Sequence, residues 1–510
     1  MSKTAFRGLF LVVLCGAAWL RVPGLGLRPM HHDEANQAVK FGLLLEKGEY
    51  RYDPVDHHGP TLYYLTLPIA WAAGKPTLAS LDESTLRFLP VLFGLGILLS
   101  FLFFAKDIGR PAVLAAAICA ALSPAFAYYS RFYIQEIPFV FFILGFIGSL
   151  WRFLERPTWI SSLATGVFAG LAFATKETSV LIFGAVAAAL VVTRFVSKRP
   201  QEGQETKGKM PVSRIAAALS AFLVTAGLLF SSFLTHPQGI VDSVTAFAAY
   251  INKSGTAGFH LHPWWYYLGL LTYSKSGGLV WSEALILALA CLGLLAAARK
   301  RNPFAVFISF YALLTLAVFS LIPYKTPWNL LPFYAGFLLL AGIGTVFVFE
   351  YARKVHFAVP AGIILVLGFA HLGWESRQAN VRYHSDPRNP YVYAQTSPDY
   401  ARLVRRIDEA AAVHPDRERL LIKVVCGPYE TWPLPWSLRK YARVGYWTEA
   451  AAAGGFDDAP VVVASQDNAE KLDPLLGGKY QAEFYGLRPE VLLTLYIRND
   501  LWENVIRRKL

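Results

Sequence analysis

The chain has 510 residues, of which 55% are apolar and only 16% are charged, and its formal net charge is +13. Soluble globular domains carry about a quarter charged residues, so this composition argues against a soluble protein. Uncharged apolar runs of about 20 residues, the length that spans a bilayer, recur through the first 374 positions. The sequence therefore predicts a polytopic membrane protein.

The positive charge belongs to the membrane part of the chain. Residues 1–374 hold 29 Lys and Arg against 17 Asp and Glu, whereas residues 375–510 hold 19 against 18. The excess is therefore interpreted as a signal of membrane topology, and nucleic acid is not an expected partner. Three of the four cysteines lie in apolar runs and Cys426 has no evident partner, so no disulfide framework is expected.

Eleven helices are predicted to span the membrane. The first follows Lys3 and Arg7 at the N-terminus, where no small-residue cleavage site is present, which predicts a retained signal-anchor. Residues 59–74 are apolar but short and contain Pro68, so they are expected to lie at the outer interface. The other ten spans are expected at residues 88–105, 111–129, 137–154, 159–175, 178–195, 214–234, 278–298, 303–322, 328–350 and 355–374.

Basic residues orient these helices. With residues 59–74 outside, the inward segments hold 17 Lys and Arg against 5 Asp and Glu, and the outward segments before residue 375 hold 12 against 12. The positive-inside rule then places the N-terminus and residues 198–209 in the cytoplasm. We therefore expect a multi-pass protein of the cytoplasmic (inner) membrane, with residues 375–510 outside.

Residues 375–510 are predicted to form an extracytoplasmic α/β domain. Strand-like runs at residues 420–425, 460–465 and 491–497 alternate with helix-like stretches such as residues 399–413. The expected organisation is thus a transmembrane domain at residues 1–374 followed by this smaller domain.

Ionisable and aromatic residues gather at the predicted outer ends of the spans. Such residues near apolar helices are costly and tend to mark function. Because short loops stay close to helix ends, we expect the following side chains to line one cavity at the membrane surface: Asp33, Glu34, Arg131, Gln135, Glu136, Lys176, Glu177, His262, Trp264, Trp265, Tyr266, Lys325, Trp328 and Asn329.

Each feature also has a structural interpretation. The two acidic residues suit the first turn of an interfacial helix, Arg131 and Lys176 suit head-group contacts, and the aromatic run suits an interface belt. The loop histidines match no standard metal-ligand spacing, which favours solvent-exposed positions for His31, His32, His57 and His58.

Several motifs follow one another in a recognisable order. They are DE at residues 33–34, HGPTLYYL, ESTLRFLP, an acidic residue after SRFYIQ, and YKTPWNLLPFYAGFLLL. In this order they resemble the GT-C superfamily of membrane glycosyltransferases, in particular protein mannosyltransferases and lipid A aminoarabinose transferases. In the tail, RNPYVYAQTSPD and YETWPLPWSLRKY are similar to flippase-associated glycosylation relatives.

The resemblance implies an inverting transfer of a sugar from a polyprenyl-phosphate donor, on the outer face, to a lipid, glycan or protein acceptor. Membrane lipids are the other expected partners. Asp33 matches the family's catalytic acidic position and is expected to act as general base for the acceptor hydroxyl. Glu34 points to another side of the helix and is expected to orient the site, while Glu136 occupies the second acidic position.

Cations are needed to stabilise the charge that gathers on the leaving phosphate. The candidates are Arg131, Lys176 and Lys325, and Lys325 is favoured because flanking prolines fix its backbone near the membrane surface. His262, Trp265, Tyr266 and Asn329 complete the expected substrate-binding set. Relatives differ in their use of a divalent ion, for which the candidate ligands here are Asp33, His32, Glu136 and His262.

Two other classes of protein remain open. One is a flippase for lipid-linked oligosaccharides, or its non-catalytic partner, and the other is a scaffold on a degenerate GT-C fold. A transporter is expected to bury polar sites near the bilayer midplane. Here the carboxylates cluster at one face, and the DE pair is retained, which favours an enzyme.

Overall fold

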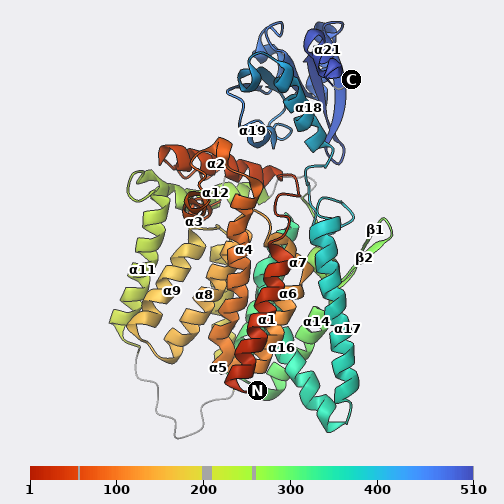
Figure 1. Ribbon diagram of the computed structural model, residues 1–510. Coiled ribbons are helices and arrows are strands. Elements are labelled where there is room, and N and C mark those ends of the chain that lie inside the picture. The colour runs from red at the N-terminus through yellow and green to blue at the C-terminus, as the bar shows by residue number, and fades with distance from the viewer. Residues whose placement is uncertain (56–57, 198–209, 255–259, 509–510) are drawn as a thin grey trace.

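The computed structural model describes residues 1–55, 58–197, 210–254 and 260–508. Membrane helices form one bundle, and a separate sheet-containing domain lies at one end of it (Figure 1). This end, and the loops at it, are called outer after their predicted orientation. The N-terminus lies at the other end of the bundle (Figure 1). The predicted cytoplasmic loop at residues 198–209 lies outside the described residues.

Helices occupy every position that was predicted to span the membrane: α1 (Lys3–Arg21), α4 (Glu83–Ser100), α6 (Arg110–Leu122), α8 (Glu136–Glu155), α9 (Trp159–Phe173), α10 (Ser179–Val196), α11 (Val212–Phe230), α14 (Ala284–Lys300), α15 (Pro303–Leu321), α16 (Leu331–Lys354) and α17 (Ala358–Arg377). Among the described residues, 8 helices are long and apolar enough to cross a membrane. The helices α6, α9 and α14 are shorter, at 13, 15 and 17 residues. The predicted helical membrane fold is confirmed.

The helix α16 is packed tightly between α6 and α14. A Cβ atom at Gly342 would clash with the carbonyl oxygen of Ala112 on α6, and one at Gly344 would clash with that of Leu289 on α14. Glycine at these two positions therefore lets the backbones approach closely, as small residues do in membrane helix pairs. The outer end of α16 carries Trp328 and Asn329 in the preceding turn, η3 (Pro327–Leu330).

The first outer loop forms two helices, α2 (His32–Lys47) and α3 (Thr61–Ala72), which lie at the end of the bundle nearer the sheet domain (Figure 1). At 12 residues, α3 is too short to span a bilayer, as its Pro68 and length predicted. The chain before α3 packs directly on the turn after α9. Gly59 donates its N–H to the oxygen of Thr175 at 3.1 Å, and a Cβ there would clash with the backbone of Ala174.

The C-terminal domain contains a five-stranded sheet in the order β4-β3-β5-β7-β6. Parallel pairing joins β3 (Leu421–Val425) to β4 (Arg443–Trp447) and β5 (Val461–Ser465), and antiparallel pairing joins β7 (Val491–Arg498) to β5 and β6 (Tyr480–Arg488). Apolar residues of α18 (Tyr400–Val413) and α21 (Asn499–Arg507) pack on one face of the sheet, and those of α20 (Gln466–Leu476) pack on the other. The predicted α/β fold of the tail is confirmed, with β4 and β6 added.

Two segments connect this domain to the membrane helices. Residues 383–396 run along the outer end of the bundle, where Thr396 donates to the oxygen of Met30 at 2.6 Å. Trp436, in the short helix α19 (Leu434–Ser437), is buried among residues of the first outer loop and donates its Nε1–H to Glu83 at 2.8 Å. These are the two tail motifs that resemble the flippase-associated relatives.

Candidate functional site

Asp33 lies in the first turn of α2, with 42% of its side chain exposed. The start of this helix is fixed by His31, whose Nδ1 accepts the backbone N–H of Asp33 at 3.0 Å. The ring proton is therefore on Nε2, which donates to the oxygen of Tyr393 at 3.0 Å. Burial lowers the pKa of His31, so its ring is neutral. The Asp33 carboxylate, 3.7 Å from Nδ1 of this ring, therefore has no charged partner in His31.

Glu34 has a different environment, because it is fully buried. It accepts from Arg87 at 2.7 and 2.8 Å, from Arg28 at 3.2 Å and from the N–H of Tyr133 at 2.9 Å. Burial alone would raise the pKa of Glu34, but the two arginines outweigh it and lower the pKa to about 2. The described contacts of Glu34 are thus all with protein groups, and they hold the start of α2 against α4 and the turn at Tyr133.

A second cluster of polar side chains comes from three segments that lie far apart in the sequence. Lys176 donates to Oε1 of Glu136 at 2.7 Å and to Oδ1 of Asn329 at 2.9 Å. All three come from helix ends or turns at the outer end of the bundle, and Lys176 and Glu136 are buried. Within the described residues, Oε2 of Glu136 is buried without a hydrogen-bond partner. Lys176 is therefore largely neutralised by its own carboxylate partner.

Lys325 is only 1% exposed. Its Nζ donates to the carbonyl oxygens of His262 at 3.0 Å and Ile322 at 2.5 Å. No carboxylate in the described parts of the chain lies within ion-pair distance of it. Burial lowers the pKa of Lys325, and burial together with Lys325 lowers the pKa of His262. The Nε2 atom of His262 is also buried without a partner among the described residues.

Trp328 packs against His31, two residues before Asp33. Its ring centroid lies 5.9 Å from that of His31, 6.0 Å from that of Phe132 and 5.9 Å from that of Tyr393. The structure therefore brings together residues 31–34, 131–136 and 325–329, to which hydrogen bonds add Lys176 and His262.

Other predicted residues lie elsewhere. Arg131 donates to the oxygen of Gly24 at 2.7 Å and lies with Arg28 and Arg87, not with the two lysines. Trp265 is 53% exposed, as the interface-belt interpretation expects, while Tyr266 stacks on His262 with ring centroids 4.1 Å apart.

The loop histidines also differ from expectation. His31 is buried rather than solvent-exposed. His58 contacts Glu177 at 2.8 Å and His57 lies outside the described residues. The ring of His32 lies 6.0 Å from that of Trp432. In the described part of the chain, no group of three or more His, Cys, Asp or Glu residues is placed to hold a metal ion, so the candidate ligands are not assembled into one site.

Several neighbours of Asp33 were missed from the sequence. His260 contacts the hydroxyl of Tyr393 at 2.7 Å and packs on Tyr324 with ring centroids 4.6 Å apart. Burial lowers the pKa of His260, and the negative charge of Asp33 opposes that shift. Asp33 acts in the same way on Arg488 of the C-terminal domain, where burial again lowers the pKa. The motif RNPYVYAQTSPD, which contains Tyr393, was noticed in the sequence, but nothing in it indicated that Tyr393 contacts His31.

Comparisons with known proteins agree with this architecture. The model of the dolichyl-phosphate-mannose-protein mannosyltransferase family matches residues 63–236. No curated protein shows significant similarity. ArnT from Cupriavidus metallidurans bound to undecaprenyl phosphate is 17% identical with a TM-score of 0.67, over 97% of this chain and 98% of that one.

The oligosaccharyltransferase AglB from Archaeoglobus fulgidus, in complex with an inhibitory peptide and a dolichol-phosphate, is 12% identical with a TM-score of 0.58, over 98% of this chain and 77% of that one. At such identities the likeness is one of fold. The chain therefore has the fold of the GT-C glycosyltransferases, as the order of its motifs predicted.

Proposed function

We propose that this protein transfers a sugar from a polyprenyl-phosphate donor to an acceptor on the outer face of the membrane, with Asp33 as general base. The observation that carries the proposal is a pairing within one site. The accessible carboxylate of Asp33 directly follows the helix start near His31, and the His31 ring contacts Trp328. Trp328 is three residues from Lys325, a buried cation that contacts carbonyl groups alone among the described residues. The GT-C fold shared with ArnT bound to undecaprenyl phosphate supports it.

In the proposed reaction, the acceptor hydroxyl gives its proton to the Asp33 carboxylate as its oxygen attacks the anomeric carbon of the donor. The bond between that carbon and the phosphate oxygen breaks, and its electron pair stays on the phosphate. Attack from the side opposite the phosphate inverts the configuration, through an oxocarbenium-like transition state. A base must be accessible, and Asp33 is, on a backbone that His31 holds in place. Glu34 has neither an open face nor a free lone pair for this task.

Lys325 is the proposed cation for the donor phosphate. A lysine ammonium has three N–H donors, and two of them are used by carbonyl groups, which leaves one for a phosphate oxygen. The unpartnered Nε2 of His262 is a second polar atom available beside it. Lys176 is less suited because Glu136 already balances its charge, so we assign Lys176, Glu136 and Asn329 to shaping the cavity around the donor.

Donor binding tests the phosphate assignment. Undecaprenyl phosphate is titrated into full-length protein in nanodiscs. Lys325→Met is expected to weaken binding about tenfold or more, because a charge-assisted contact in a desolvated site is lost. The matched control is Lys300→Met, since Lys300 is 52% exposed at the opposite end of the bundle. Equal affinities for wild type and a folded Lys325→Met variant would remove Lys325 from the donor site.

A further inference from the structure

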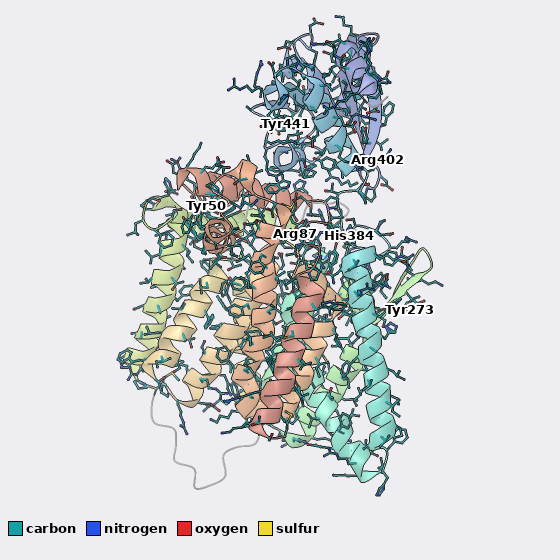
Figure 2. The ribbon with its side chains drawn as sticks, viewed as in Figure 1. Tyr50, Arg87, Tyr273, His384, Arg402 and Tyr441 are labelled. Atoms are coloured by element: carbon teal, nitrogen blue, oxygen red, sulfur yellow. The ribbon has the colours of Figure 1, made fainter. Side chains whose placement is uncertain are left out.

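A small pocket lies beside the candidate site, at the outer ends of α1 and α4. Its lining includes Gly24, Arg28, Arg87, Arg131, Asn380 and His384. Figure 2 labels Arg87 and His384 at the end of the bundle that faces the C-terminal domain. The empty volume is about 220 Å³, part of which is open to solvent. The opening is near Gly24 and His384, because the three arginines and Asn380 are buried.

The charges around this pocket do not balance. Three buried guanidinium groups meet there, and Glu34 is the one carboxylate that pairs with any of them in the described residues. Glu34 contacts Arg87 and Arg28, and Arg131 has only carbonyl partners, at Gly24 and Leu20. Two positive charges therefore remain without a counter-charge, and uncompensated buried charge is strongly unfavourable.

Two further observations indicate an anion rather than a water molecule. The Nε–H of Arg28 is buried without a hydrogen-bond partner in the described part of the chain. In addition, burial and the neighbouring arginines lower the pKa of His384 to about 4 and that of Arg131 to about 10. Burial is the larger cause of both shifts, and the neighbouring arginines add a positive potential that an anion would relieve and a water molecule would not.

We propose that the pocket holds one small monovalent inorganic anion of chloride size, bound by N–H groups of Arg28 and Arg131. Arg87 lies beside it and contributes positive charge only, because its N–H groups already donate to Glu34, Met30 and the carbonyl groups of Leu25, Arg28 and Pro29. The enclosed space has room for about one water-sized particle, which excludes a sugar or a lipid chain. The anion stabilises the chain between α1 and α2, since Arg28 and Gly24 belong to that segment. This inference does not depend on the proposed glycosyl transfer.

Thermal unfolding of the full-length protein in nanodiscs tests the anion site. Protein dialysed into gluconate is titrated with chloride, bromide or sulfate at constant ionic strength. Chloride and bromide are expected to raise the midpoint saturably, by on the order of 2 °C, because a ligand of the folded state stabilises it. Crystals grown in bromide should show an anomalous peak between the three arginines.

Variants assign the effect to this pocket. Arg131→Met removes one cation and is expected to lose the halide response, and His384→Phe, which fills the opening, is expected to do the same if Arg131→Met does not fold. The control Arg402→Gln changes an exposed arginine of the C-terminal domain (Figure 2) and should keep the response. The proposal is overturned if halides have no effect and give no anomalous peak, if sulfate alone stabilises, or if a pocket variant responds as wild type does.

Discussion

The two ends of the helix bundle treat charge differently. At the end near the N-terminus, Arg152 meets the buried side chain of Asp107 at 2.5 Å and Glu155 at 2.7 Å, and Lys300 meets Glu350 at 2.5 Å. At the outer end, Lys325 and Arg131 are buried with carbonyl partners only in the described residues. A buried charge that has a charged partner needs no ligand to balance it. A buried charge without such a partner is expected to bind a ligand of opposite charge. This difference supports the proposal that the functional site lies at the outer end.

Removing the carboxylate of Glu34, which pairs with two buried arginines, should have the largest effect on stability. Glu34→Gln leaves Arg87 and Arg28 buried without their charge partner, which is expected to destabilise the protein by about 3–5 kcal/mol. The matched change at the other end, Glu350→Gln, breaks an exposed pair and should cost less than about 1 kcal/mol. Thermal or denaturant unfolding in detergent measures both, and equal losses would contradict the comparison.

Acid should separate wild type from Glu34→Gln. The pKa of Glu34 is lowered from 4.5 to about 2 in the folded protein, so the ionised carboxylate stabilises the fold above pH 4.5. That contribution is lost as the pH falls towards 2. Wild type is therefore expected to lose stability through this range more steeply than Glu34→Gln does. Parallel unfolding midpoints of the two proteins between pH 5 and pH 2 would show that Glu34 is not held ionised.

A smaller effect on stability is expected from losing a hydrogen bond that supports the segment next to His31. The hydroxyl of Tyr391 donates to the buried carboxylate of Glu283 at 2.5 Å, and two residues later the oxygen of Tyr393 accepts from His31. Tyr391→Phe should cost about 1–2 kcal/mol and also reduce sugar transfer, because the support of His31 is loosened. Tyr441→Phe is the control, since it loses a similar bond to Asp408 within the C-terminal domain.

Stability and sugar transfer measured on both variants separate positioning from general destabilisation. A fall in transfer for Tyr391→Phe alone supports a positioning role. Equal transfer by the two variants, at similar losses of stability, would mean that residues 391–393 do not support the site.

The orientation of the protein in the membrane can be tested with substitutions outside the candidate site. Single cysteines are placed at Arg402, whose side chain is 67% exposed in the C-terminal domain, and at Lys300, at the other end of the bundle. The native Cys426 is buried and unsuitable for labelling. A membrane-impermeant maleimide should label Arg402→Cys in intact cells and Lys300→Cys only after permeabilisation. The reverse pattern would invert the proposed topology.

Much of the fold was predictable because its signals are local. Long apolar runs and clusters of basic residues marked each membrane helix, and Pro68 marked the interfacial α3. The partners inside the site carry no such signal. Lys176 meets Asn329 across 153 positions and His31 meets Tyr393 across 362. Arg131 resembled a phosphate ligand in sequence, yet the turn that carries it directs it towards the end of α1.

The most direct test of the account is Asp33→Asn. This change keeps the size of the side chain but removes its ability to take a proton, so sugar transfer is expected to fall by about 10² to 10⁴. Affinity for undecaprenyl phosphate should stay the same, and stability should change by less than about 1 kcal/mol, because only a helix-terminus charge is lost. Transfer is measured as consumption of the polyprenyl-phosphate sugar in native membranes, which supply the acceptor, from cells lacking the wild-type protein. Near wild-type transfer by a folded Asp33→Asn protein would contradict the assignment of Asp33 as general base.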